Sequence, residues 1–161
     1  MKLIIILFIQ LISLFCYSQE NNLYNPQLDG KLQIKQAIEL AQKNNKHVLI
    51  QVGGNWCPWC IRFHKFLNKV PKIDSLVQSS YIYVPLNYSR ENKNEESLKL
   101  LEFPQRFGFP VLVILDQNGK RIHTQNSALL EKEQSYDTTK VFQFLQHWTP
   151  QAIDPNQYIK H

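Results

Sequence analysis

The chain has 161 residues, a formal net charge of +5 and three cysteines. This length suits one domain with a single hydrophobic core. The lysines and arginines are scattered along the chain and form no dense basic block. We therefore interpret these charges as ordinary solvent-exposed side chains, and no nucleic-acid partner is predicted.

The first 18 residues have the pattern of a secretory signal peptide. Lys2 precedes an apolar stretch over residues 3–15, and small residues at Cys16 and Ser18 suit cleavage after Ser18. The apolar stretch is shorter than the roughly 20 residues that span a bilayer. Lipidation of Cys16 is the less favoured alternative, because a bulky phenylalanine precedes it. We therefore expect a periplasmic or secreted protein.

Residues 19–30 are polar and predict a flexible lead-in. After them, the hydrophobic pattern predicts helices and strands in alternation. The predicted helices cover residues 32–44, 58–70, 73–78 and 97–103, with a last one that runs from a cap at Thr138 or Thr139 to Pro150. The predicted strands cover residues 47–52, 81–87, 111–115 and 120–124, and residues 89–96 are expected to form a loop.

The order of these elements predicts the fold class. Asn118-Gly119 favours a tight turn, so the strands on either side of it would pair antiparallel. A parallel βαβ half followed by an antiparallel ββα half makes an α/β fold with a mixed central sheet and helices on both faces. We expect one domain over residues 31–149 and a C-terminal tail over residues 150–161.

The segment Cys57-Pro58-Trp59-Cys60 follows a predicted strand and opens a predicted helix. The positive end of the helix dipole and its unpaired N–H groups favour a thiolate on Cys57. Pro58 suits the first helical position, where its missing N–H costs nothing. Cys60, on the first turn, is then placed to attack a mixed disulfide formed at Cys57. This arrangement favours a redox pair.

A structural disulfide and a metal site are the alternatives for the two cysteines. A disulfide that closes so short a loop stabilises a fold by only about 2 kcal/mol in the chain-entropy model. His64 is the nearby candidate for a third metal ligand, and a fourth is missing. No metal and no cofactor are therefore predicted. His64 itself is interpreted as a partly exposed histidine rather than an electrostatic helper of the thiolate.

Three segments together resemble the thioredoxin superfamily. They are Trp56–Cys60 after an apolar strand, Gly108-Phe109-Pro110 before the strand at 111–115, and the turn at 116–120. The chain is most similar to exported bacterial thioredoxin-like proteins, including the C-terminal domain of the DsbD type, over roughly residues 30–148. The resemblance implies a thioredoxin fold.

The resemblance also implies roles for individual residues. Cys57 would be the nucleophile and Cys60 the resolving cysteine. Pro110 would be a cis-proline packed against the pair, and Phe109 would offer backbone groups to an extended substrate. Trp56 would shape the surface beside Cys57.

Two residues depart from the family pattern. Cytosolic members carry a buried acid six residues ahead of the first cysteine, where this chain has Gln51. An amide cannot take the proton from Cys60. Trp59, inside the motif, adds bulk and an N–H group but no charge. The motif therefore does not determine the redox potential of the cysteine pair, which ranges from about −270 to about −120 mV among members of the family.

Two functions remain in competition. The first is an exported thiol-disulfide oxidoreductase that acts on substrate proteins with disulfides or thiols and receives electrons from a membrane or periplasmic donor. Oxidants of the DsbA type carry a helical domain inserted in this fold, and the 22 residues between Asn87 and Pro110 are too few for one. The reducing direction is therefore favoured. The second function is a binding or chaperone module, for protein or copper, without redox turnover.

Overall fold

The structure is a computed structural model that describes residues 22–159. The predicted signal peptide and the alternative lipidation site at Cys16 lie outside the described residues. The main sheet contains β1 (His47–Gly53), β2 (Tyr81–Asn87), β3 (Val111–Leu115) and β4 (Arg121–Asn126). The α-helices are α2 (Gly30–Asn44), α3 (Pro58–Lys69), α4 (Pro71–Ser80), α5 (Glu95–Leu100) and α6 (Thr138–His147).

The sheet has the strand order β2-β1-β3-β4 and mixed pairing. β1 runs parallel to β2 and antiparallel to β3, and β3 pairs antiparallel with β4. β1 is a central strand and every residue in it is buried. β2 is an edge strand, and its Pro85 lies opposite Gln51 of β1. Proline has no backbone N–H to donate, and an edge strand tolerates this because it has no neighbouring strand on its outer side.

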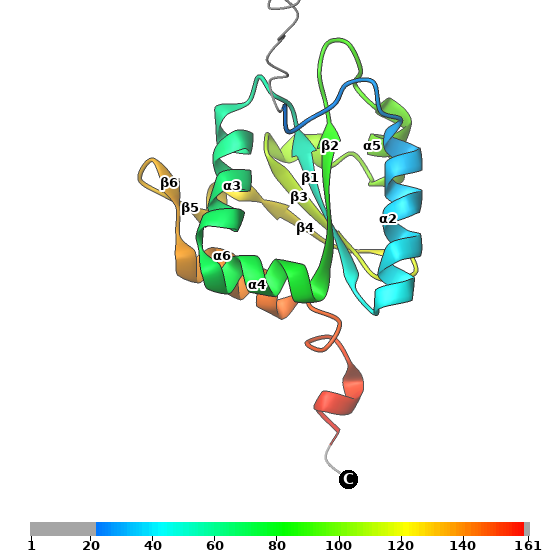
Figure 1. Ribbon diagram of the computed structural model, residues 1–161, viewed down its shortest axis with the longest axis vertical. Coiled ribbons are helices and arrows are strands. Elements are labelled where there is room, and N and C mark those ends of the chain that lie inside the picture. Colours follow the sequence, from blue (N-terminus) through cyan, green and yellow to red (C-terminus); the bar gives the residue numbers. More distant parts are fainter. Residues whose placement is uncertain (1–21, 160–161) are drawn as a thin grey trace, which may run out of the picture.

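Helices cover both faces of the sheet, as the sequence predicts. Figure 1 shows α2 and α5 on one side and α3, α4 and α6 on the other. Alternate side chains of β1 point to opposite faces of the sheet. Ile50 packs on the face that α2 covers, and Leu49 packs with Phe63 and Leu145 on the face that α3 and α6 cover. The mixed α/β fold is thus confirmed.

Several element ends differ from the prediction. α6 is capped by Asp137, whose carboxylate accepts the N–H groups of Thr139 at 2.8 Å and Lys140 at 3.1 Å, so the predicted threonine cap was wrong. α6 also ends at His147, before Pro150. α5 begins at Glu95, inside the predicted loop.

The connection between β4 and α6 contains structure that the sequence pattern does not predict. A 3-10 turn, η3 (Ser127–Leu130), leads into a short antiparallel hairpin of β5 (Glu131–Lys132) and β6 (Ser135–Tyr136). Tyr136 is buried in the same core layer as α3. The hairpin thereby brings a side chain to the start of α3.

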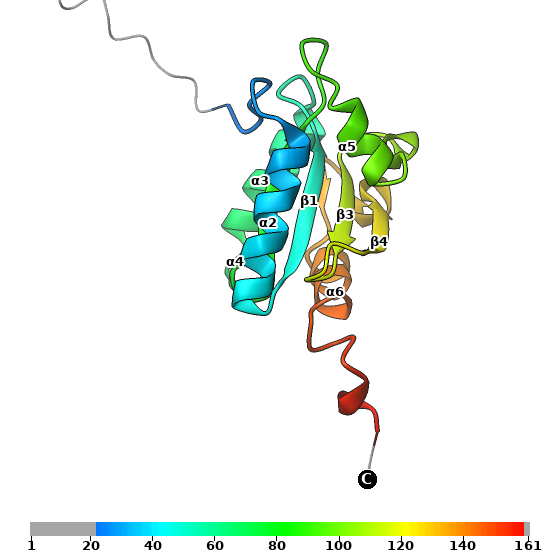
Figure 2. The ribbon, with the colours of Figure 1, turned by 90° about the vertical axis from the view of Figure 1, so that its right-hand side faces the viewer.

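Two further 3-10 turns complete the description of residues 22–159. η2 (Pro104–Phe107) precedes Gly108, and η4 (Pro155–Gln157) lies in the C-terminal segment. Figure 2 shows that this C-terminal segment leads away from the body of the domain. α3 begins at the opposite end of the sheet from this segment (Figure 1).

Candidate active site

A disulfide joins Cys57 and Cys60 at the start of α3, with their Cα atoms 5.2 Å apart. Cys57 is the N-cap of the helix, and its Sγ accepts the backbone N–H of Cys60 at 3.1 Å. Pro58 occupies the first helical position. Cys57 retains a slight exposure of 4%, whereas Cys60 has none. An incoming thiol or disulfide therefore meets Cys57 first.

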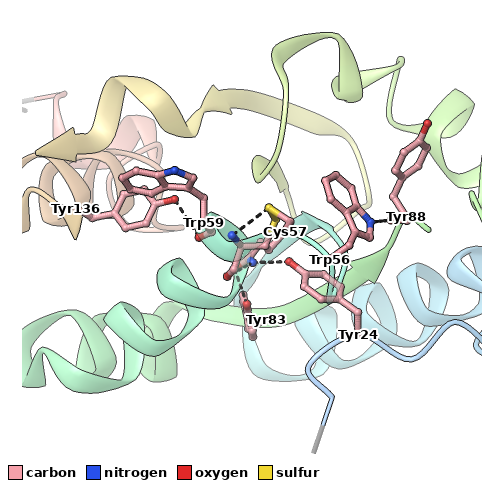
Figure 3. Close-up of a disulfide and its surroundings, with 9 residues drawn as sticks. Tyr24, Trp56, Cys57, Trp59, Tyr83, Tyr88 and Tyr136 are labelled. Carbon is pink, nitrogen blue, oxygen red and sulfur yellow. Dashed lines mark hydrogen bonds between the residues drawn. A yellow bond between two sulfur atoms is a disulfide. The ribbon is translucent and has the colours of Figure 1, made fainter. Parts of the chain in front are cut away.

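Aromatic side chains form one wall beside the disulfide (Figure 3). Trp56 is half exposed, and its indole N–H donates to the backbone oxygen of Tyr88 at 2.7 Å. Phe109 packs against the cluster that contains both cysteines, edge-on to Trp56 at 5.3 Å between ring centres and stacked on Tyr88 at 4.8 Å. The peptide bond between Phe109 and Pro110 is cis, as the resemblance implies. The structure thus brings Trp56 and Phe109 together beside the cysteine cluster, and Pro110 follows Phe109 through the cis bond.

The opposite wall is built around Trp59, to the other side of Cys57 in Figure 3. The Tyr136 ring meets Trp59 edge-on at 5.5 Å, and the Tyr136 hydroxyl donates to the Trp59 backbone oxygen at 3.2 Å. The Arg62 guanidinium lies 4.5 Å from the centre of the Trp59 ring. The motif tryptophan brings no charge of its own, but its ring holds a cation next to the motif.

Gln51 lies behind the disulfide and is completely buried. Its amide nitrogen donates to the Cys60 backbone oxygen at 2.9 Å and also to the Tyr24 hydroxyl. Its amide oxygen accepts the Tyr83 hydroxyl at 2.7 Å. Burial raises the pKa of both tyrosines, so each stays a neutral hydroxyl at physiological pH. A neutral network therefore occupies the place where cytosolic members of the family carry an acid.

Tyr24 is a site residue that the sequence does not reveal. It has no exposed surface, although it lies in the polar segment before α2. Its backbone N–H donates to the Asn55 side-chain oxygen at 3.1 Å, and the Asn55 amide nitrogen donates back to its carbonyl at 2.7 Å. The contact joins residues 31 positions apart and follows no motif or periodicity. An aromatic residue within a polar stretch was the available signal.

Two glycines permit the close approach of these groups. A Cβ atom on Gly53 would lie 2.5 Å from Cys60 Sγ and 2.8 Å from the Tyr24 hydroxyl oxygen. A Cβ atom on Gly54 would lie 2.6 Å from the Trp56 ring and 2.7 Å from the Tyr88 backbone oxygen. All four distances are shorter than a Cβ atom tolerates, so a side chain at Gly53 or Gly54 would displace these groups.

His64 lies one turn after Cys60 and is half-buried. Its ring stacks on Tyr83 with 5.7 Å between centres, and its Nε2 lies 3.2 Å from the Asn68 amide nitrogen. Burial lowers the pKa of His64, so the imidazole is uncharged at neutral pH. An uncharged ring gives a thiolate no electrostatic support. Over residues 22–159, no cluster of three or more His, Cys, Asp or Glu side chains could hold a metal ion.

An open pocket of about 700 Å³ lies beside Trp56. The residues that follow β2 form most of its lining, with Asn55 and Trp56 on the other side. Arg90, Glu91 and Lys93 place charges of both signs along it. Trp56 joins this pocket to the cysteine motif, and neither cysteine lines the pocket itself.

Comparison with known proteins agrees with this geometry. Residues 34–138 match the family model described as the thioredoxin-like domain, and the chain belongs to that family. It therefore has a fold of the thioredoxin-like disulfide oxidoreductase kind, with a cysteine pair in CxxC spacing. No match is found among curated proteins.

A solved structure shows the same fold. A disulphide isomerase from Xylella fastidiosa Temecula1 superposes with a TM-score of 0.67 at 23% identity, over 76% of this chain and 93% of that chain. A protein described as DsbH oxidoreductase gives a TM-score of 0.49 at 19% identity, over 70% of this chain and 78% of that one. At 23% identity, the likeness to the disulphide isomerase concerns the fold alone.

Proposed function

We propose that this protein is an exported thiol-disulfide oxidoreductase that reduces disulfides in substrate proteins through Cys57 and Cys60. The observation that carries the proposal is the placement of Cys57 as the N-cap of α3, with its sulfur accepting a backbone N–H and with Phe109 packed against the cluster that contains both cysteines. Such a placement favours a thiolate. The protein that acts as substrate supplies the disulfide.

Each step of the reaction is a thiol-disulfide exchange. In the reduced protein, the Cys57 thiolate attacks one sulfur of the substrate disulfide, and the other substrate sulfur leaves as a thiolate that takes a proton from water. Cys60 then loses its proton to water and attacks Cys57 Sγ. The bond to the substrate breaks, the second substrate thiolate leaves and is protonated, and the Cys57–Cys60 disulfide forms. The substrate gains two electrons and the protein loses two.

Trp56, Phe109 and Pro110 are proposed to bind the substrate chain during these steps. Trp56 is half exposed beside Cys57, and Phe109 packs between Trp56, Tyr88 and the cysteine cluster. Burying apolar substrate surface on the Trp56 and Phe109 rings would hold a disulfide over Cys57. A membrane or periplasmic donor would return the electrons to the resulting disulfide.

The reducing direction and the export are parts of the proposal with their own support. The connection between β2 and β3 holds only α5 and η2, which leaves no helical domain of the kind inserted in strong oxidants of the DsbA type. The pattern of residues 1–18 supports export. Over residues 22–159, the structure has no helix of the length and apolar character required to cross a membrane.

Substitution of the resolving cysteine tests the proposal. A Cys60→Ala variant can form the mixed disulfide at Cys57 but cannot release it. Expressed with its leader in a Gram-negative bacterium, it should accumulate covalent adducts with envelope proteins. These adducts should disappear on treatment with dithiothreitol, and mass spectrometry should identify Cys57 as the linked residue.

The matched control is the double variant Cys57→Ser, Cys60→Ala, which keeps the fold and lacks the nucleophile. It should form no adducts. If Cys60→Ala also forms none, or if its adducts persist when Cys57 is replaced, the oxidoreductase proposal fails and a binding module without redox turnover becomes the better account.

A further inference from the structure

We propose that Tyr24 stabilises the resolving cysteine: its hydroxyl donates a hydrogen bond to the Cys60 sulfur when that sulfur becomes a thiolate. The inference rests on the proposed function, since only a redox cycle forms this thiolate. It assigns a role in the exchange reaction to a residue that precedes α2 and lies outside the part of the chain that matches the family model.

The hydrogen-bond partners of Gln51 determine the orientation of its amide. The Cys60 backbone oxygen can only accept a hydrogen bond, so the atom of Gln51 that lies 2.9 Å from it must be the nitrogen. The same nitrogen faces the Tyr24 hydroxyl, and the amide oxygen accepts from Tyr83. Both hydrogens and the oxygen of the Gln51 amide are therefore already engaged in hydrogen bonds.

The consequence for Tyr24 is a hydroxyl hydrogen that is free to be donated. The Tyr24 oxygen accepts from Gln51, and it makes no second hydrogen bond with any residue between 22 and 159. Tyr24 has no exposed surface, so this hydrogen points into the protein. A buried donor without an acceptor is unfavourable, and a nearby anion would satisfy it.

Cys60 Sγ is the reactive atom that shares this space. It and the Tyr24 oxygen both lie within 2.8 Å of the point where a Cβ on Gly53 would stand, and both residues belong to one buried cluster with Cys57. In the disulfide state the sulfur is a weak acceptor. In the reduced protein, Cys60 becomes a thiolate before it attacks the mixed disulfide at Cys57, and a thiolate is a strong acceptor.

The two cysteines therefore differ in their source of stabilisation. Cys57 Sγ accepts a backbone N–H from its own helix. Cys60 is more deeply buried, and burial disfavours its thiolate. The titratable and charged groups packed around the motif are Tyr24, Tyr83, His64, Arg62 and Tyr136.

Of these groups, Tyr24 is the one whose hydroxyl hydrogen is uncommitted and adjacent to Cys60. Tyr83 donates to Gln51 and Tyr136 donates to the Trp59 backbone oxygen. Arg62 lies over the Trp59 ring, and His64 is stacked on Tyr83. Tyr24 makes no net proton transfer: the Cys60 proton goes to water, and the departing substrate thiolate takes one from water.

The test measures the Cys60 thiol without turnover. In a Cys57→Ser variant, Cys60 is the remaining cysteine of the mature chain, and its ionisation can be followed by the ultraviolet absorbance of the thiolate. Adding Tyr24→Phe removes only the hydroxyl and should raise the Cys60 pKa by roughly one to two pH units, the value of one hydrogen bond to a charged group. Adding Tyr136→Phe, which removes a hydroxyl that donates elsewhere, should leave it unchanged.

A spectroscopic measurement tests the same proposal without the Tyr24→Phe variant, in case that variant does not fold. In Cys57→Ser with Tyr24 intact, the ¹³C resonance of the ring carbon that bears the Tyr24 hydroxyl should shift with the Cys60 pKa, whereas the same carbon of Tyr81 should not. The proposal is overturned if Tyr24→Phe leaves the Cys60 pKa in place, if Tyr136→Phe moves it equally, or if the Tyr24 resonance is insensitive to Cys60. None of these readouts depends on turnover, so failure here is distinguishable from failure of the adduct experiment.

Discussion

At the scale of single residues, burial controls which groups of this protein carry charge. His47 opens β1 and is almost fully buried, and its Nδ1 lies 2.7 Å from the backbone oxygen of Trp148. A carbonyl only accepts, so Nδ1 carries the hydrogen and the ring can remain neutral. Burial lowers the pKa of His47, and the bond to Trp148 and the charge of Asp116 oppose this effect only in part.

This lowered pKa predicts that acid destabilises the protein. The unfolded chain binds a proton at His47 near pH 6.5, where the folded chain resists it, so protons favour unfolding as the pH falls through that value. The free energy of unfolding, from urea titrations, should be constant above about pH 7.5 and decline toward about pH 5. His64 acts in the same direction.

A His47→Gln variant isolates the contribution of His47. Glutamine can still donate to the Trp148 oxygen but does not titrate. The variant should therefore show a shallower decline between the same two pH values than the parent protein. A decline as steep as that of the parent would show that His47 is not the group responsible.

At the scale of secondary structure, caps determine where the helices that support the site begin. Asp137 Oδ1 satisfies two N–H groups of α6, the helix that packs behind α3 and α4. Asp154 makes the same kind of bond at η4, in the segment that leads away from the domain. The two caps are chemically alike and differ in what their helix packs against.

Removing each cap should therefore have different effects. Asp137→Ala should lower the free energy of unfolding by about 1 kcal/mol, because the N–H groups of Thr139 and Lys140 at the start of α6 lose their acceptor. Asp154→Ala should leave it within about 0.5 kcal/mol of the parent value. Urea titration of both variants measures the difference. Equal losses in the two variants would contradict the account of α6 as part of the cooperative fold.

Some helices and strands could be predicted from the sequence and others could not. The strands of the main sheet and the helix that carries the cysteines were predicted because their signals are local: β-rich runs, apolar periodicity, and proline at the first helical position. The threonine cap was wrong because Asp137, Thr138 and Thr139 stand together and all can cap, so composition alone does not choose between them. The β5–β6 hairpin is too short to show an alternating pattern.

The site was predicted unevenly for the same reason. Cys57, Cys60 and the Phe109–Pro110 segment follow from local motifs and from their resemblance to the family. The roles of Tyr24 and Tyr83 depend on contacts with Gln51 across 27 and 32 positions, which only the folded chain reveals. The departure at Gln51 was visible in the sequence, but what the amide does there was not.

At the scale of the whole molecule, the fold places one disulfide at one end of a mixed sheet, between two aromatic walls. β1 and α3 supply the motif, the loop after β2 and the segment before β3 supply one wall, and the β5–β6 hairpin supplies the other (Figure 3). The Tyr24–Gln51–Tyr83 network lies behind the motif and is neutral. The assembly has the parts that thiol-disulfide exchange requires.

The equilibrium of Cys57 and Cys60 with glutathione tests whether this protein is a disulfide reductase. The purified mature protein is equilibrated in buffers with graded ratios of reduced and oxidised glutathione, its thiols are alkylated, and the reduced fraction is measured by mass spectrometry. We expect one reversible two-electron transition confined to Cys57 and Cys60, with a potential nearer to about −270 mV than to about −120 mV. A potential near about −120 mV would contradict the reducing direction. The absence of a reversible transition would contradict redox function altogether.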